Sequence, residues 1–149
     1  MEIKNLYDPA AKQAIIERIN KLTPDTPRQW GKMDVAQMLA HLQQPLEVAL
    51  GHRTITGTFF FNLIMPLFKK TLWDDKPWKK GLPTDATYIM TGEAKEFQQE
   101  KTKLLELINQ FNEAALSDKK HPVFGFMTKE QWSQSGWKHI DHHLKQFGA

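Results

Sequence analysis

Histidines are the residues of this sequence whose spacing is best suited to chemistry. Six are present, and two of them, His139 and His143, are four residues apart in a segment with helical periodicity. Residues four apart lie one turn apart on the same side of a helix, with their Cβ atoms about 5–6 Å from each other. Because two imidazoles in that arrangement can bind one metal ion through ring nitrogens, the pair is a candidate for two ligands of a metal centre.

A third candidate ligand, His41, lies in another amphipathic segment. A helical projection places it at the edge of the apolar stripe rather than on the solvent side. Metal sites in helical bundles take side chains from facing helices, and three imidazoles would leave a coordination position open for water or substrate. Pro45, four residues after His41, lacks the amide hydrogen that would bond to the His41 carbonyl, so we expect the helix to kink or loosen there.

The neighbours of the three histidines narrow the chemistry. In the zinc-protease pattern H-E-x-x-H a glutamate follows the first histidine, whereas Ile140 occupies that position in this chain. Asp141 is expected on the far side of the apolar stripe and His142 on the solvent side. Gln146, three residues after His143, is the nearest polar neighbour and is expected to support the ligands by a hydrogen bond. The sequence identifies no catalytic side chain beyond the ligands.

Imidazole ligands favour zinc or nickel, with iron and manganese as alternatives. A divalent ion held by three neutral imidazoles would lower the pKa of a bound water or thiol and generate a nucleophile near neutral pH. The chain has no cysteine, which excludes disulfide bonds, thiolate ligands and a sulfur nucleophile of its own. Any thiol in the reaction would therefore be a low-molecular-weight cosubstrate.

The composition is that of one soluble domain over residues 1–149, with 40% apolar and 25% charged residues. A net charge of +3 without a basic stripe argues against a nucleic-acid partner. The most apolar run, residues 59–68, has about half the length that a membrane span needs, and the N-terminus lacks the features of a signal peptide. We therefore expect a cytoplasmic protein that is not inserted in a membrane and acts on a small molecule.

Apolar residues at spacings of three and four predict four helices, which should position the histidines. They cover approximately residues 9–22, 35–50, 92–115 and 128–147. The expected fold class is all-α, a four-helix bundle with a long, partly helical crossover between the second and third helices. Within that crossover, residues 59–69 are expected to form a helical turn that covers the bundle, lines a pocket or makes a homodimer contact.

Two further residues are candidates for a pocket wall. His121 precedes the fourth helix and could present its imidazole at the mouth of the bundle, and Trp132 lies in the first turns of that helix. The interpretation that we favour is simpler: His121 orders its own loop, and Trp132 packs in the core.

Three segments of the chain resemble the DinB-like superfamily of helical proteins. They are residues 30–33 (WGKM) leading into residues 37–41 (QMLAH), and residues 138–148 (KHIDHHLKQFG). Within that superfamily, the chain is most similar to a domain family of unknown function that also carries a segment like residues 121–125 (HPVFG). The resemblance extends, in the same order, over essentially the whole chain.

The resemblance implies a metal-binding four-helix bundle, in which one histidine of the second helix and a pair from the fourth hold a divalent ion. The matching positions are His41, His139 and His143, and Gln146 takes the place of a glutamine that commonly follows the pair. Lys145 stands where a small residue is usual. Characterised relatives in the superfamily include S-transferases and isomerases that depend on low-molecular-weight thiols.

The expected function is therefore that of a metal-dependent, S-transferase-like enzyme that activates a low-molecular-weight thiol or water. A metal-dependent hydrolase is one alternative. A non-catalytic helical bundle that binds a small molecule is another, because a fold by itself does not determine a reaction.

Overall fold

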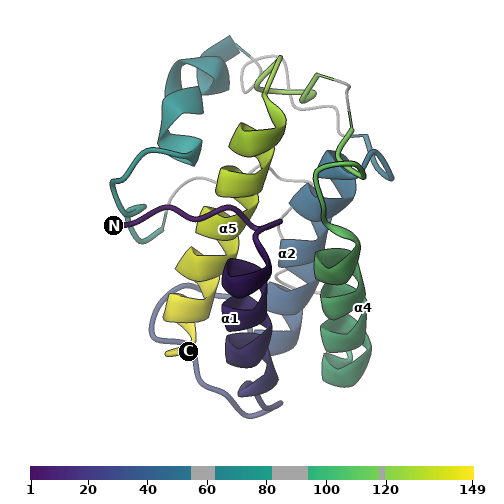
Figure 1. Ribbon diagram of the computed structural model, residues 1–149. Coiled ribbons are helices and arrows are strands. Elements are labelled where there is room, and N and C mark those ends of the chain that lie inside the picture. The colour runs from purple at the N-terminus through teal and green to yellow at the C-terminus, as the bar shows by residue number, and fades with distance from the viewer. Residues whose placement is uncertain (55–62, 82–93, 118–119) are drawn as a thin grey trace.

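The structure, a computed structural model, describes residues 1–54, 63–81, 94–117 and 120–149. The helices of the described residues are α1 Pro9–Asn20, α2 Val35–Ala49, η1 Met65–Leu72, α4 Phe97–Gln110 and α5 Lys129–Gln146. Within these ranges the only β-structure is an isolated bridge between His121 and Gly125. The predicted all-α class is thus confirmed (Figure 1).

Local capping signals begin three of the helices where the sequence predicts. Before α1, the Asp8 side chain accepts a hydrogen bond from the Ala11 amide, and Pro9 takes the first helical position. Asp34 and Thr128 each form a reciprocal capping box with the glutamine three residues later, at the starts of α2 and α5. These predicted helix starts are confirmed.

The third predicted helix is shorter than expected. Residues 92–115 are predicted to be helical, but α4 occupies Phe97–Gln110, and residues 92 and 93 lie outside the described part of the chain. At its start, the Glu96 carboxylate accepts hydrogen bonds from two amides of the first turn. Beyond its end, the Asn112 side chain accepts a hydrogen bond from the Ala115 amide, a local turn that replaces helical hydrogen bonds. The prediction is therefore wrong for residues 94–96 and for residues 111–115.

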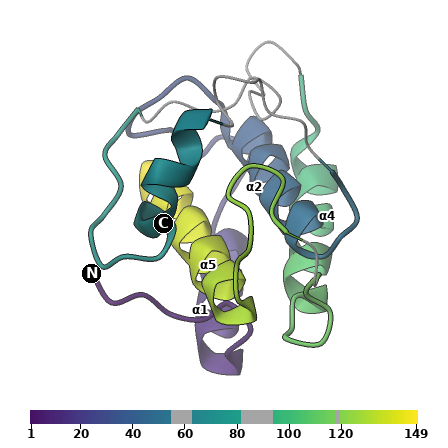
Figure 2. The same ribbon diagram turned by 90° about the horizontal axis from the view of Figure 1, so that it is seen from above.

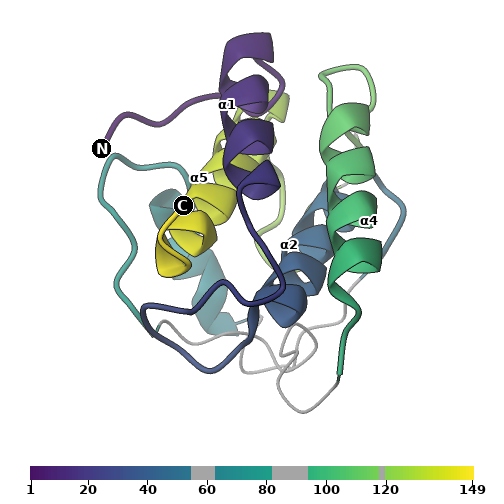
Figure 3. The ribbon, with the colours of Figure 1, turned by 90° about the horizontal axis from the view of Figure 1, so that it is seen from below.

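The four α-helices share one core. Both α1 and α2 contact α4 and α5 (Figure 1, Figure 3). Lys12, near the start of α1, donates to the Phe111 carbonyl at the end of α4, so these two helices run in opposite directions. Arg18, near the end of α1, pairs with Asp141 in the second half of α5, so α1 and α5 run in the same direction. The α-helical side chains that are at most 1% exposed include Ile15, Ile19, Met38, Leu39, Leu42, Leu104, Ile108, Ile140 and Leu144.

The connection between α2 and α4 carries a short helix that overlaps the predicted helical turn and extends beyond it. Within the predicted turn over residues 59–69, residues 63–69 are helical, and the 3₁₀ helix η1, Met65–Leu72, continues three residues further; residues 55–62 lie outside the described part. Pro66 occupies its first turn, where the missing amide hydrogen costs no helical hydrogen bond. Viewed from above, η1 lies against α5 (Figure 2). None of the described helices combines the length and the apolarity of a membrane span.

Candidate metal centre

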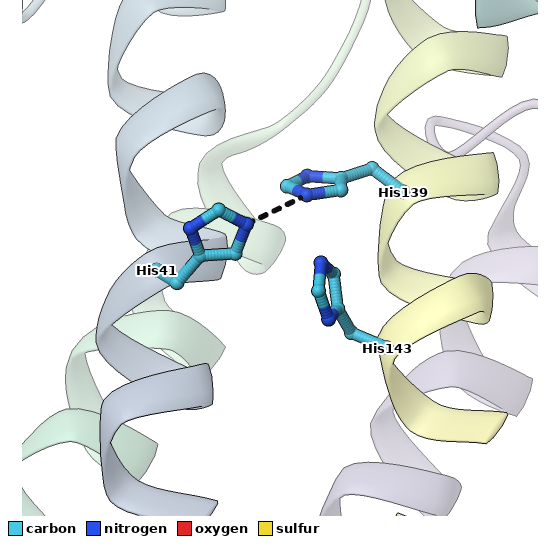
Figure 4. Close-up of side chains that lie close together, drawn as sticks. All are labelled: His41, His139 and His143. Atoms are coloured by element: carbon cyan, nitrogen blue, oxygen red, sulfur yellow. Dashed lines mark hydrogen bonds between the residues drawn. The ribbon is translucent and has the colours of Figure 1, made fainter. Parts of the chain in front are cut away.

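Three histidine side chains from two helices meet between α2 and α5. His41 comes from α2, and His139 and His143 come from α5 (Figure 4). The centroids of the three rings are 4.8–4.9 Å apart in each pair. One ring nitrogen of each histidine lies within 4.8 Å of the corresponding nitrogens of the other two. The structure therefore brings together the three residues that the sequence singles out as ligands.

The two helices position these side chains in different ways. His41 is 5% exposed, on a helix that is buried over most of its surface. His139 and His143 are one turn apart on α5 and partly buried. The helix α2 continues unbroken through Pro45, so the expected loosening beside His41 does not interrupt it.

The distance between the His41 and His139 rings fits a shared divalent ion, and the His143 nitrogen lies within 4.8 Å of both. Two imidazole nitrogens that bind one ion, each at about 2.0–2.1 Å, lie about 2.9–3.4 Å apart at octahedral or tetrahedral angles. The Nε2 atoms of His41 and His139 are 3.0 Å apart. As a hydrogen bond, the same contact requires one of these rings to donate and the other to accept. A donor set of neutral nitrogens suits zinc, nickel or another first-row divalent ion.

The environment keeps the two α5 histidines in the form that a metal ion would require. Burial, together with repulsion from the nearby His41 ring, lowers the pKa of His143 to about 3. Burial also lowers the pKa of His139 well below its usual value, with added repulsion from His143 and His41. Both rings are therefore neutral near pH 7, and a neutral imidazole is the form that binds metal.

Gln146 lies beside the histidine cluster and contacts His143. Its Oε1 is 2.7 Å from Nδ1 of His143, and its Nε2 donates to the carbonyl oxygen of Trp30 at 2.8 Å. The side chain is almost fully buried. Gln146 thus connects a candidate ligand to the loop that precedes α2, a contact that helical spacing along α5 alone does not reveal.

His142 is placed differently from the prediction. It is expected to face solvent, but it is half-buried, with its ring centroid 5.8 Å from that of Trp30 and 5.6 Å from that of Trp78. Burial lowers its pKa. The expectation is wrong because a helical projection describes α5 by itself, whereas two segments distant in the sequence fold over this side of it. Trp78 also lies beside the site, 5.7 Å from the His139 ring.

Lys138 is a buried residue at the site that sequence analysis missed. Its side chain is 1% exposed, and its ammonium donates to the carbonyls of Thr71 and Asp74 and to the Asp74 carboxylate at 2.7–2.8 Å. This contact lowers the pKa of Asp74. The Trp78 indole donates to the same Thr71 carbonyl, so the stretch after η1 is fixed on α5 beside His139. Lysine on a helix is usually exposed, so the local pattern contains no signal for this anchor.

Nearby carboxylates are engaged in ion pairs outside the histidine cluster. Asp141 is 4% exposed and binds Arg18 at 2.8 Å and Lys145 at 2.7 Å. Glu47 on α2 pairs with two basic side chains. Within the described ranges, the cluster that could hold a metal consists of histidines alone.

The two predicted pocket residues, His121 and Trp132, contact each other, with ring centroids 5.0 Å apart. Nδ1 of His121 accepts hydrogen bonds from the amides of Val123 and Phe124 at 3.0 and 3.1 Å. Burial lowers the pKa of His121 to about 4. Trp132 is 5% exposed and belongs to the core. These contacts favour the simpler interpretation, in which His121 orders its own loop.

Comparison with known families places the chain in one of them. It belongs to the family described as protein of unknown function (DUF1569), whose sequence profile matches residues 3–149. Neither the curated proteins nor the solved structures yielded a match.

Proposed function

We propose that this protein is a metal-dependent enzyme of the DinB-like type, in which His41, His139 and His143 hold a divalent ion, zinc or nickel by ligand type. The observation that carries the proposal is the convergence of one ring nitrogen from each histidine, with the first two 3.0 Å apart. When bound, the ion would supply Lewis acidity, which lowers the pKa of a water or thiol at its open position.

The finer architecture that we propose is a four-helix bundle made by α1, α2, α4 and α5, with η1 on the long crossover. Support comes from the core that these helices share and from the ligands' origin on two neighbouring helices. Sites in such bundles are built from side chains on facing helices.

The chain's own residues would hold the ion and shape the space around it. Burial keeps His139 and His143 neutral near pH 7, so they need not lose protons on binding. Trp78 lies against His139 and would form an apolar wall for a small electrophilic substrate. Because the chain has no cysteine, a thiol nucleophile would be a cosubstrate. S-transfer to an electrophile is the reaction that we favour, and hydrolysis is the alternative.

The first experiment determines metal content by elemental mass spectrometry on untagged protein. We expect about one equivalent of zinc or nickel in the wild type after incubation and dialysis, and loss of the ion in each of His41→Ala, His139→Ala and His143→Ala. His52→Ala, which removes an exposed histidine elsewhere, is the matched control and should retain the ion. A wild type that retains no ion would sink the proposal.

The second experiment tests the reaction with metal-loaded protein. Electrophilic substrates are incubated with and without a low-molecular-weight thiol. Thioether formation that requires both the thiol and His139 supports S-transfer, whereas turnover without a thiol supports hydrolysis. Stoichiometric metal binding with no turnover in either assay would leave the non-catalytic helical bundle as the better description.

A further inference from the structure

We propose that the loop before α2 sets the tautomer of His143. The Trp30 carbonyl, with Gly31 beside it, orients the Gln146 amide so that the proton of His143 is held on Nδ1 and Nε2 is left as the ligand atom. Trp30 and Gly31 are then positioning residues for the centre. The role of Nε2 as a ligand rests on the proposed function, whereas the tautomer itself does not.

The first step is the orientation of the Gln146 amide. A backbone carbonyl oxygen has no hydrogen and can only accept, so the group 2.8 Å from the Trp30 oxygen must be the amide nitrogen. The reverse orientation would bring two acceptor oxygens into contact in a buried place, which is strongly unfavourable. The carbonyl of Trp30 therefore decides which end of the amide faces His143.

The second step is the effect of the Gln146 orientation on the His143 imidazole. The Gln146 oxygen lies 2.7 Å from Nδ1 of His143 and can only accept. Nδ1 of His143 must therefore carry the proton. In a neutral ring the other nitrogen, Nε2, then has a free lone pair, and Figure 4 shows that nitrogen on the side of the other two rings. His143 is thus held in the tautomer that a ligand needs, before any ion binds.

Gly31 allows the amide to occupy this place. Its φ is +83°, a conformation that residues with a Cβ rarely adopt. A Cβ added at this position would overlap with Nε2 of Gln146, the atom that donates to Trp30. The amide cannot easily move aside, because the side chain is 3% exposed and the Gln146 backbone carbonyl is itself bound by the Gln29 amide at 2.7 Å. Gly31 therefore serves the site by having no side chain.

The direct test measures the His143 tautomer by NMR, from the ¹⁵N shifts of its ring nitrogens in metal-free protein near neutral pH. In the wild type we expect the proton on Nδ1. In Gly31→Ala, the displaced amide should no longer select that form, and the Nε2-protonated tautomer should appear. A wild-type His143 that carries its proton on Nε2 would overturn the inference without any variant.

A matched control separates this effect from backbone strain. Gly125 has a similar φ of +71°, but a Cβ added to it would meet no atom within 4 Å. Gly125→Ala therefore introduces a comparable strain without touching Gln146, and it should leave the His143 tautomer unchanged. Equal tautomer shifts in the two alanine variants would contradict the proposed role of Gly31.

Gln146→Glu provides a second route that does not depend on how well Gly31→Ala folds. One carboxylate oxygen can accept from Nδ1 while the other turns away from the Trp30 carbonyl, so the tautomer should be retained although the bond to Trp30 is lost. With no amide left to orient, Gly31→Ala should have no further effect on the tautomer in this background. Gln146→Leu has no acceptor for Nδ1, so the Nε2-protonated tautomer of His143 should appear in that variant. A Gln146→Leu protein that keeps the Nδ1 proton would overturn the relay.

Zinc affinity, measured by competition with a chromophoric chelator, connects the relay to the metal centre. We expect binding to weaken by about 10- to 100-fold in Gly31→Ala, the usual effect of losing a group that supports a ligand, and to stay unchanged in Gly125→Ala. Nδ1 protonation in a wild type that binds no zinc supports the relay while the proposed function fails. Unchanged zinc affinity in Gly31→Ala, despite a changed tautomer, would overturn the link between the loop and the metal.

Discussion

His121 and the histidines of the candidate metal centre look alike by several measures. Burial lowers the pKa of His121 to about 4 and that of His143 to about 3. Each site also has an aromatic neighbour. The ring centroid of Trp132 lies 5.0 Å from that of His121, and the ring centroid of Trp78 lies 5.7 Å from that of His139. Burial, shifted pKa and aromatic contacts would therefore select both places as functional candidates.

The two places differ in what the ring nitrogens face. In His121, Nδ1 accepts hydrogen bonds from two amides of its own loop. In the candidate centre, one nitrogen of each ring faces the corresponding nitrogens of the other two. A lowered pKa indicates that a histidine is buried. Ring nitrogens that converge from two helices indicate that the histidines could bind one metal ion.

Removal of a proposed metal ligand should have the largest effect. We expect His139→Ala to weaken zinc binding by about 100-fold or more, because two imidazoles cannot replace three. His121→Ala should bind zinc with wild-type affinity and stoichiometry. Isothermal titration of both variants measures this difference. If His121→Ala loses the ion as well, the distinction between the two places is wrong.

Lys138, which anchors the segment after η1 on α5, should make a large contribution to the free energy of unfolding. Lys138→Met leaves the Asp74 carboxylate and two carbonyls without their buried partner, so we expect the free energy of unfolding to fall by about 3 kcal/mol. Lys145→Met, on the same helix, removes an ion pair of a lysine that is 55% exposed and should cost less than about 1 kcal/mol. Urea unfolding measures both. Equal losses would show that Lys138 is not a special anchor.

The lowered pKa of His121 should make the free energy of unfolding depend on pH. Its pKa is about 4 in the folded protein and 6.5 when unperturbed, so between these values the unfolded chain binds a proton that the folded chain does not. The stability that this difference in the pKa of His121 contributes is fully present above about pH 6.5 and is lost as the pH falls toward about 4. In His121→Asn, whose side-chain oxygen can still accept the loop amides, the slope should fall by at most about 1.4 kcal/mol per pH unit. Unfolding curves at several pH values measure it, and an unchanged slope would contradict the assigned burial.

The smallest effect is expected at His142, next to the proposed ligand His143. His142 precedes His143 but packs against Trp30 and Trp78 and is not one of the three converging histidines. His142→Gln should therefore leave the zinc affinity unchanged. Competition with a chelator would show this, and a loss comparable to that of His139→Ala would add His142 to the ligands.

The sequence by itself determined the features that lie within one helix. A separation of four residues puts His139 and His143 on the same side of α5 whatever packs against it. Capping boxes begin α2 and α5 for the same reason: their hydrogen bonds join residues three apart. Periodicity also placed His41 at the edge of the buried stripe, although it did not show what that edge faces.

Only the tertiary structure decided the contacts between distant segments. The 3.0 Å contact joins His41 to a residue 98 positions away, and the Trp30 carbonyl meets Gln146 across 116 positions. Periodicity indicates which side of a helix is apolar but not which segment covers each side. That choice depends on burying apolar surface and satisfying polar groups across the whole chain. The local pattern therefore contains no signal for the burial of Lys138 or for the covering of His142. Both result from residues distant in the sequence that pack onto α5.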